Sequence, residues 1–155
     1  MTLSKCNTFL KLIIFVSLFL LLWIEVYSYD RPPIGLWKTF DDQTGDEKSL
    51  VEIIVEDGKL TGKIDSLFLS PDEDQNPLCD ECKGERKDKQ IIGMTILWNL
   101  KKKNDKWSGG KILDPENGKI YGCKLEVIEN GDKLKIRGFL GLSLLGRTQY
   151  WEKVE

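Results

Sequence analysis

Cys79 and Cys82 form a Cys-x-x-Cys pair, a spacing found in redox dithiols, in metal sites and in structural disulfides. A redox dithiol needs a helix N-terminus that lowers the pKa of its first thiol, but this pair lies between Pro77-Leu78 and Lys83-Gly84 in a loop. A four-thiolate zinc site needs a second pair, and beyond the N-terminal segment only Cys123 remains. These features favour a structural disulfide formed in an oxidising compartment.

The three cysteines Cys79, Cys82 and Cys123 leave one thiol over once a disulfide forms. Cys123 alternates with Tyr121 and Leu125 on the apolar face of an expected strand, where a lone cysteine behaves as a small hydrophobic residue. Cys79 and Cys82 are close in the sequence, so a bond between them costs the chain little conformational entropy. We therefore predict a Cys79 to Cys82 disulfide and a free, buried Cys123. The alternative is a bridge from the loop to Cys123.

The sequence contains no histidine. This excludes Ser-His-Asp and Cys-His nucleophile systems and every imidazole metal ligand. General acid-base chemistry would fall to Asp41, Asp42, Asp114, Glu116 and Tyr121. All of these except Tyr121 lie in expected turns, where carboxylates cap the backbone. We therefore expect no catalytic residues, no metal and no cofactor, and a protein that is not an enzyme.

Residues 1–28 have the pattern of a secretory signal helix. Lys5 and Lys11 precede thirteen uncharged, mostly apolar residues that end at Ile24, and Val26 and Ser28 suit the positions before a cleavage site. The apolar run is shorter than the roughly 20 residues that span a bilayer. We expect an exported protein, periplasmic or extracellular, without a stable membrane span after cleavage, although a retained anchor is the alternative.

The charge balance of the mature chain does not favour binding to nucleic acid. Removal of Lys5, Lys11 and Glu25 leaves 21 basic and 24 acidic residues, a net charge of −3. A nucleic-acid partner requires a basic patch, and the lysines here are interspersed with carboxylates. The remaining 127 residues suffice for one domain, which we place at 34–155 after a stiff lead-in at 29–33.

Alternating apolar and polar residues recur along this domain, and turn signals such as Asp57-Gly58 and Asn117-Gly118 separate the runs. A predicted loop at 70–89 interrupts this alternation, because it contains two prolines and seven carboxylates and has no apolar periodicity. We expect limited proteolysis to cut there first. The expected strands are 34–40, 48–55, 60–69, 90–100, two strands within 107–127, 133–140 and 147–154.

Consecutive hairpins without helical periodicity predict an all-β fold, a single antiparallel eight-stranded up-and-down barrel, with a sandwich as the alternative. Glycines within the strand patterns are typical of the bends of a closed sheet. A barrel of this size holds either packed side chains or one small ligand. Aromatic residues could therefore line a ligand site or fill the interior, and the candidates are Tyr121, Trp98, Trp107 and Trp151.

The segment 140–146 is rich in leucine and too short for a helix. Leu140, Leu142, Leu144 and Leu145 would form an apolar patch for a partner or a membrane if they were exposed. Most apolar clusters are buried, so we expect this bend to plug one end of the barrel.

Gly35-Leu36-Trp37 at the start of the first strand, together with Arg147 at the start of the last, resembles the lipocalin pattern in which an arginine packs across the tryptophan. The resemblance implies that Gly35, Trp37 and Arg147 close the barrel, with Arg147 packed over a buried Trp37.

A wider resemblance covers nearly all of residues 34–154. The chain is similar to the bacterial family catalogued as domain of unknown function 2147, which consists of small exported proteins. The resemblance implies a lipocalin-like or streptavidin-like barrel and carries no reaction, ligand or catalytic residue. The matching segments are Gly35-Leu36-Trp37, Cys79 to Gly84, Gly109 to Lys119, Arg137 to Gly141 and Gly146 to Thr148.

Two functions remain open at this stage. The first is a non-enzymatic binding module of the cell envelope, with a small apolar or amphipathic ligand inside the barrel. The second is a structural module with a packed interior, which meets an envelope protein through the 70–89 loop or the leucine-rich bend. A connected cavity of about 300 Å³ or more would favour the first.

Overall fold

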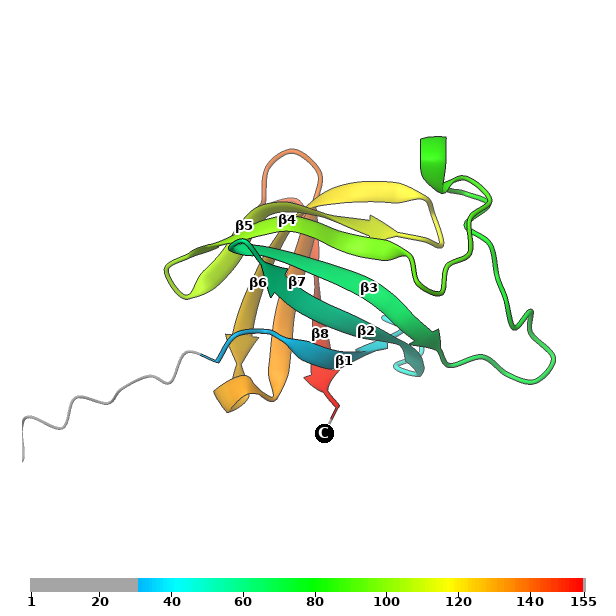
Figure 1. Cartoon of the computed structure of the whole chain (residues 1–155), viewed down its shortest axis with the longest axis horizontal. Coiled ribbons are helices and arrows are strands. Elements are labelled where there is room, and N and C mark those ends of the chain that lie inside the picture. The colour runs from blue at the N-terminus through cyan, green and yellow to red at the C-terminus, as the bar shows by residue number, and fades with distance from the viewer. Residues whose placement is uncertain (1–30, 155) are drawn as a thin grey trace, which may run out of the picture.

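The computed structural model describes residues 31–154. The predicted signal peptide at 1–28 and the first two residues of the lead-in lie outside the described residues. Within 31–154 the chain forms eight strands, each paired antiparallel with the next (Figure 1). The strands are β1 (Gly35–Phe40), β2 (Glu47–Glu56), β3 (Lys59–Leu67), β4 (Thr95–Lys103), β5 (Lys106–Asp114), β6 (Lys119–Ile128), β7 (Lys133–Phe139) and β8 (Gly146–Lys153).

The first and last strands close the sheet. Trp37 pairs with Lys153 and Lys38 with Glu152, so β1 and β8 join the wall into a barrel. Single turns of 3₁₀ helix lie at Gly84–Arg86 and Glu129–Gly131. None of the helices in the described part of the chain is long and apolar enough to cross a membrane. The predicted all-β up-and-down barrel is therefore confirmed.

The boundaries of β4 differ from those predicted. Gln90 forms only an isolated bridge with Leu78, and residues 91–94 form a turn in which the amide of Ile91 donates to Pro77 O and the amide of Gly93 donates to Ile64 O. At its other end β4 continues to Lys103 and turns at Asn104, which has a φ of 56°. The lysine run at 101–103 has no apolar alternation, yet it pairs with the start of β5, and this pairing extends the strand.

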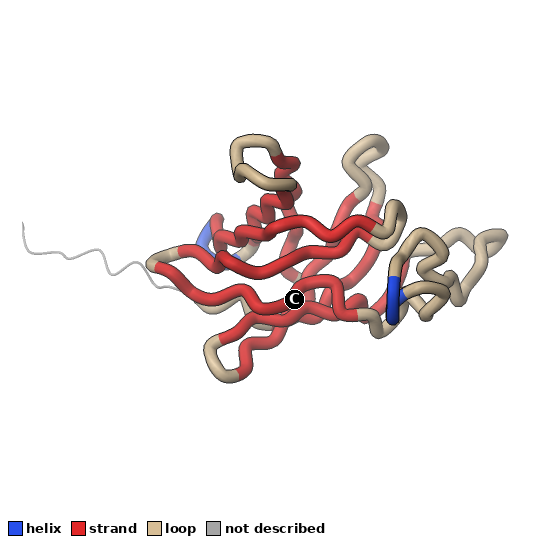
Figure 2. The backbone as a smooth tube through the Cα atoms, turned by 90° about the horizontal axis from the view of Figure 1, so that it is seen from above, coloured by secondary structure: helices blue, strands red, loops and turns tan. Residues whose placement is uncertain are grey.

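The connections divide into two sets, one at each end of the barrel. The tight turns after β2, β4 and β6 lie at one end, here called the closed end. The loop between β3 and β4 extends well beyond the other end, here called the open end (Figure 2). The segments at the open end are 41–46, 68–94, 115–118 and 140–145.

The closed half of the barrel is filled by apolar side chains. Trp37, Leu60, Leu100 and Leu134 are completely buried there, and Trp107 is almost so. These residues occupy the ends of their strands nearest the tight turns, and their alternation with exposed neighbours is the pattern expected of a barrel wall.

The Trp37 side chain makes two polar contacts. Its Nε1 donates to Pro33 O at 2.9 Å, and the Nζ of Lys153 lies 5.1 Å from the ring centroid. Gly35 has a φ of 121°, a backbone conformation that favours glycine, and it lies beside the Lys153 side chain. Lys153 thus supplies the basic residue that packs on Trp37.

The expectation that Arg147 packs over Trp37 is wrong. Arg147 follows the first residue of β8 at the open end, whereas Trp37 pairs with Lys153 at the opposite end of that strand. The guanidinium of Arg147 is largely exposed and forms an ion pair with Asp42. Arg147 therefore belongs to the open end of the barrel.

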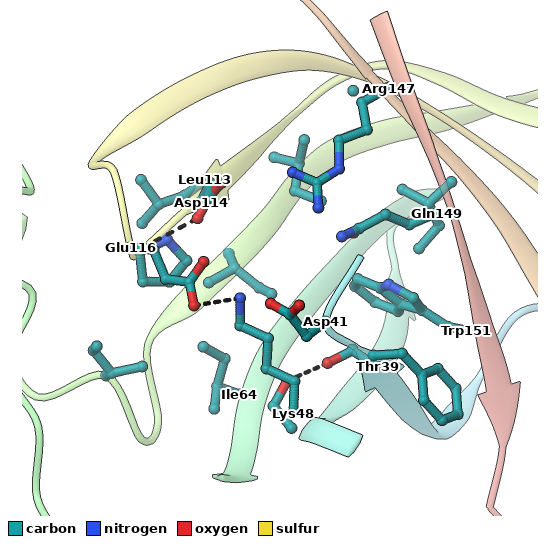
Figure 3. A pocket seen from close by; sticks show the side chains of 18 of the residues that line it. Thr39, Asp41, Lys48, Ile64, Leu113, Asp114, Glu116, Arg147, Gln149 and Trp151 are labelled. Atoms are coloured by element: carbon teal, nitrogen blue, oxygen red, sulfur yellow. Dashed lines mark hydrogen bonds and ion pairs between the residues drawn. The ribbon is translucent and has the colours of Figure 1, made fainter. Parts of the chain in front are cut away.

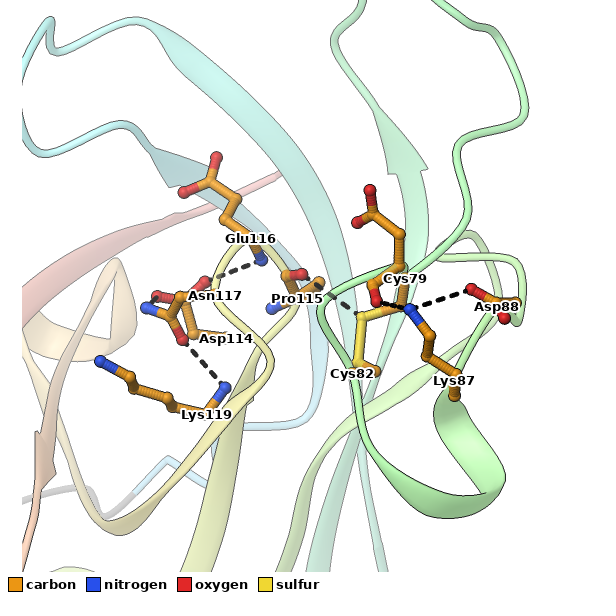
Figure 4. Close-up of a disulfide and its surroundings, with 10 residues drawn as sticks. Cys79, Cys82, Lys87, Asp88, Asp114, Pro115, Glu116, Asn117 and Lys119 are labelled. Carbon is orange, nitrogen blue, oxygen red and sulfur yellow. Dashed lines mark hydrogen bonds and ion pairs between the residues drawn. A yellow bond between two sulfur atoms is a disulfide. The ribbon is translucent and has the colours of Figure 1, made fainter.

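The loop between β3 and β4 is anchored through its second half. The predicted Cys79 to Cys82 disulfide is present, Cys79 is fully buried, and its amide donates to Lys89 O at 2.8 Å (Figure 4). The Sγ of Cys79 also lies 3.3 Å from Pro115 O, a close contact rather than a hydrogen bond because a disulfide sulfur carries no proton. The bridge to Cys123 considered as an alternative is therefore wrong.

The disulfide segment packs directly on the turn between β5 and β6. Gly118 has a φ of 64°, and a Cβ at this position would lie only 1.9 Å from Glu81 O. Glycine is therefore required at Gly118 both by the turn and by this close approach. Residues 70–76, in contrast, are exposed along their whole length.

Limited proteolysis should separate these two halves of the loop. We expect the first cut of the native protein within 70–76, and new cuts within 77–91 only after the disulfide is reduced. The chain-entropy model gives so small a ring about 2 kcal/mol at most, so reduction should shift the unfolding midpoint only modestly. Mass spectrometry of the fragments gives the order of cutting, and a first cut within 109–127 would contradict the strand assignment.

Candidate functional site

The open half of the barrel is hollow. A cavity of about 790 Å³ begins above the packed closed half and reaches the loops of the open end. This volume exceeds the roughly 300 Å³ that a small-ligand site needs. Most of the side chains on its inner wall are apolar, among them Ile64, Leu67, Ile91, Ile96, Ile112, Ile136, Phe139 and Trp151.

A few polar groups interrupt this apolar wall. Thr39 and Ser49, both buried, face each other across β1 and β2 with their hydroxyl oxygens 2.7 Å apart. The indole Nε1 of Trp151 is buried and has no hydrogen-bond partner among the described residues. An apolar wall with a small number of placed polar groups is typical of sites for small molecules.

Charged side chains surround the mouth of the cavity (Figure 3). The cations there are already paired, Lys48 with Glu116 at 2.5 Å and Arg147 with Asp42. Gln149 adds a hydrogen bond from Nε2 to Asp42 Oδ2 at 3.0 Å. Other carboxylates that line the mouth form no ion pair with a cation of residues 31–154, and they are Asp41, Asp46, Glu73 and Asp114.

Asp41 is fixed in its charged form by the loop that it caps. Its Oδ1 accepts the amides of Gln43 at 2.8 Å and Thr44 at 2.9 Å. These bonds to Thr44 and Gln43 lower the pKa of Asp41 below its usual value, with a smaller contribution from Lys48. The mouth of the cavity is therefore negative at neutral pH.

The predicted ligand-lining aromatic residues separate into two groups. Tyr121 and Trp151 line the cavity. Trp107 lies in the packed closed half. Trp98 does not line the cavity; it is half-buried against the core, and the Arg86 guanidinium lies 4.6 Å from its ring centroid. Asn99 has a φ of 60°, so the alternation of β4 changes beside Trp98, and the sequence carries no clear sign of this.

The carboxylates considered for acid-base chemistry are engaged in turns. Asp114 accepts the amide of Glu116 at 3.1 Å and the side-chain amide of Asn117 at 2.8 Å, while Glu116 and Asp42 are in ion pairs. Tyr121 is linked to Asn117 through its hydroxyl at 3.4 Å. These contacts support the structural role expected of residues in turns.

The leucine-rich bend does not plug the barrel, and that expectation is wrong. The exposed fractions of Leu140, Leu142, Leu144 and Leu145 are 58, 72, 84 and 74%. Arg137, which the sequence reasoning did not single out as functional, holds the bend through bonds to the carbonyls of its residues 143 and 144. The outward position of Arg137 in an alternating strand gave no sign of this role.

Cys123 faces the barrel interior as a free thiol. Burial raises its pKa to about 12, so the thiol stays neutral and unreactive in the folded protein. The thiol of an unfolded chain has a pKa near 8.5. The contribution of Cys123 to the free energy of unfolding is therefore complete below about pH 8.5 and decreases progressively as the pH rises toward 12.

Alkylation of Cys123 should therefore require unfolding. At pH 8 we expect iodoacetamide to leave Cys123 unmodified in the native protein and to modify it completely in guanidinium chloride, as read by peptide mapping. Rapid modification of Cys123 under native conditions would contradict its burial.

Comparisons with known proteins agree with this architecture. A model of the family described as "uncharacterized protein conserved in bacteria (DUF2147)" matches residues 35–153. A solved structure described as protein HP1028 from Helicobacter pylori, belonging to the lipocalin family, is similar with a TM-score of 0.68 and 20% identity. The match covers 80% of this chain and 84% of that chain, and at this identity it shows the fold alone. No curated protein matches the chain.

Proposed function

We propose, from the premise that this chain belongs to the DUF2147 family of uncharacterized bacterial proteins and has a lipocalin-like barrel, that it binds one small apolar or amphipathic molecule without catalysing a reaction. The observation that carries the proposal is the cavity of about 790 Å³ inside the barrel. Ligand sites commonly have volumes of about 300 to 1,000 Å³.

The polarity of the cavity supports a particular orientation of the ligand. Its apolar body would lie against the isoleucines of the inner wall, where burial removes apolar surface from water. Its polar end would lie at the mouth, beside Asp41, Asp46 and Glu73. Because these carboxylates form no ion pair within the described part of the chain, a neutral or cationic polar end suits the mouth better than an anionic one.

The second candidate, a structural module with a packed barrel, is less well supported, because side chains fill only the closed half of the interior. Export remains part of the proposal. The disulfide between Cys79 and Cys82 supports an oxidising compartment such as the periplasm or the extracellular space.

Titration with N-phenyl-1-naphthylamine, a neutral apolar fluorophore, tests the proposal. We expect a saturable increase in fluorescence with a stoichiometry of one probe per chain, and displacement by a long-chain alkylamine more readily than by the alkanoate of equal length. A fluorescence change that rises linearly without saturation would show that the cavity does not bind such molecules.

A further inference from the structure

The segment 140–145, here called the leucine loop, presents the most exposed large apolar side chains of the described residues. Leu140, Leu142, Leu144 and Leu145 are each more than half exposed, and no charged residue lies between Phe139 and Gly146. Single exposed leucines are ordinary, but four within six residues form a contiguous patch of the kind that marks an interaction surface.

Three carbonyls of the leucine loop already accept hydrogen bonds. The amide of Leu145 donates to Leu142 O at 3.0 Å, and Arg137 donates from Nε to Ser143 O at 2.8 Å and from Nη2 to Leu144 O at 2.9 Å. Nη1 of Arg137 binds Thr148 Oγ1 at 2.9 Å and so fixes the guanidinium to β8. Polar backbone groups that enter lipid must have partners inside the protein, and these carbonyls have them.

The position of the leucine loop links it to the cavity. Leu140 and Leu145 also line the cavity, so any surface that covers the loop lies next to the mouth. The loop projects from the barrel beyond the ends of β7 and β8 (Figure 1). A projecting apolar tip inserts readily into a fluid apolar medium, whereas a protein partner would have to offer a groove of matching shape.

The charges around the leucine loop fit a lipid surface of a particular kind. Arg137 and Arg147 flank it, but Arg137 is bound to the loop's own carbonyls and Arg147 to Asp42, so the loop offers no unpaired arginine to an anionic headgroup. The carboxylates at the mouth, including Asp46 and Glu73, would be repelled by an anionic surface.

From these observations we propose that the leucine loop inserts into a zwitterionic lipid bilayer and places the mouth of the cavity against it. This inference goes beyond ligand binding and does not depend on it. An apolar or amphipathic molecule that fits the cavity also partitions into a membrane. The docked barrel could exchange such a molecule with the bilayer without passage through water.

A fluorophore placed within the loop tests the insertion locally, whatever the N-terminal segment does. The probe is nitrobenzoxadiazole on Ser143→Cys in the full chain with Cys6→Ser, because Cys123 is buried and the other cysteines form the disulfide. The vesicles are phosphatidylcholine, with and without a nitroxide on the acyl chain. We expect a blue shift of the emission and its quenching by the nitroxide lipid.

Two matched double variants identify the side chains responsible. Leu142→Ser with Leu144→Ser should weaken the partitioning of the loop about tenfold or more, because each leucine contributes several buried methylene equivalents. Ile34→Ser with Tyr150→Ser removes exposed apolar side chains outside the leucine loop and should leave the partitioning unchanged.

Two outcomes would overturn the proposal. One is a probe on the loop that remains in an aqueous environment at millimolar phosphatidylcholine. The other is a blue shift without vesicles that grows with protein concentration and is lost in the leucine variant, which would assign the loop to contact with a second copy. Because probe binding to the cavity is measured without vesicles, either result leaves the test of ligand binding intact.

Discussion

The Trp37→Ala variant is expected to lose about 3 to 5 kcal/mol of unfolding free energy, the range for truncation of a buried large aromatic side chain. Trp37 is completely buried at the pairing between β1 and β8, and its Nε1 bond to Pro33 O ties the lead-in to the barrel. Its loss would leave a void where the barrel closes. Urea unfolding followed by the fluorescence of the remaining tryptophans measures the change.

The controls for this prediction distinguish the two basic residues near the ends of β8. Arg147→Ala should cost no more than about 1 kcal/mol, because its pair with Asp42 is exposed. Lys153→Met keeps the aliphatic stem over Trp37 and should lose about 1 kcal/mol for the missing cation. A large cost for Arg147→Ala together with none for Trp37→Ala would contradict closure of the barrel through Trp37 and Lys153.

The Gly138→Leu variant is expected to weaken binding of the neutral fluorophore by at least tenfold, equivalent to about 1.4 kcal/mol. Gly138 lines the cavity, and a Cβ there would lie 3.5 Å from Ile112 Cγ2 and 3.6 Å from Tyr121 Cβ, which are ordinary contact distances. The Cβ of a leucine can therefore be added without displacing the wall, and we expect the rest of the side chain to extend into the cavity. Fluorescence titration gives the affinity.

Stability must be preserved for this result to report on the cavity. Glycine weakens the interior of a strand, so the substitution should leave the unfolding midpoint equal or slightly higher. Lys135→Leu, on the exposed face of the same strand, is the matched control and should bind like the unchanged protein. Unaltered affinity in Gly138→Leu would show that the fluorophore binds elsewhere.

Local patterns in the sequence were sufficient to predict the barrel. Alternation such as Val51 with Ile53, and turn pairs such as Asp57-Gly58, define the strands through interactions between neighbours in the chain. The disulfide was predictable for the same reason, since Cys79 and Cys82 lie close along the sequence. The buried, free state of Cys123 followed from its place in the alternation.

Features that depend on distant contacts were not predictable in this way. The register between the first and last strands decides which residue of β8 lies beside Trp37. The sequence pattern indicates Arg147 for this position, whereas Lys153 occupies it. The start of β4 depends on bonds between residues 91–94 and the rest of the chain. The cavity depends on how all the strands pack together. The exposure of the leucine loop depends on the hydrogen bond from Arg137 to Ser143 O.

Native mass spectrometry of the protein purified from its own cells is the most direct test of ligand binding in the barrel. We expect a population heavier than the polypeptide by the mass of one small molecule, which is released on denaturation and is absent from the Gly138→Leu protein. Recovery of the unchanged protein solely at the mass of its polypeptide, together with no saturable binding of the neutral fluorophore, would contradict the proposed function.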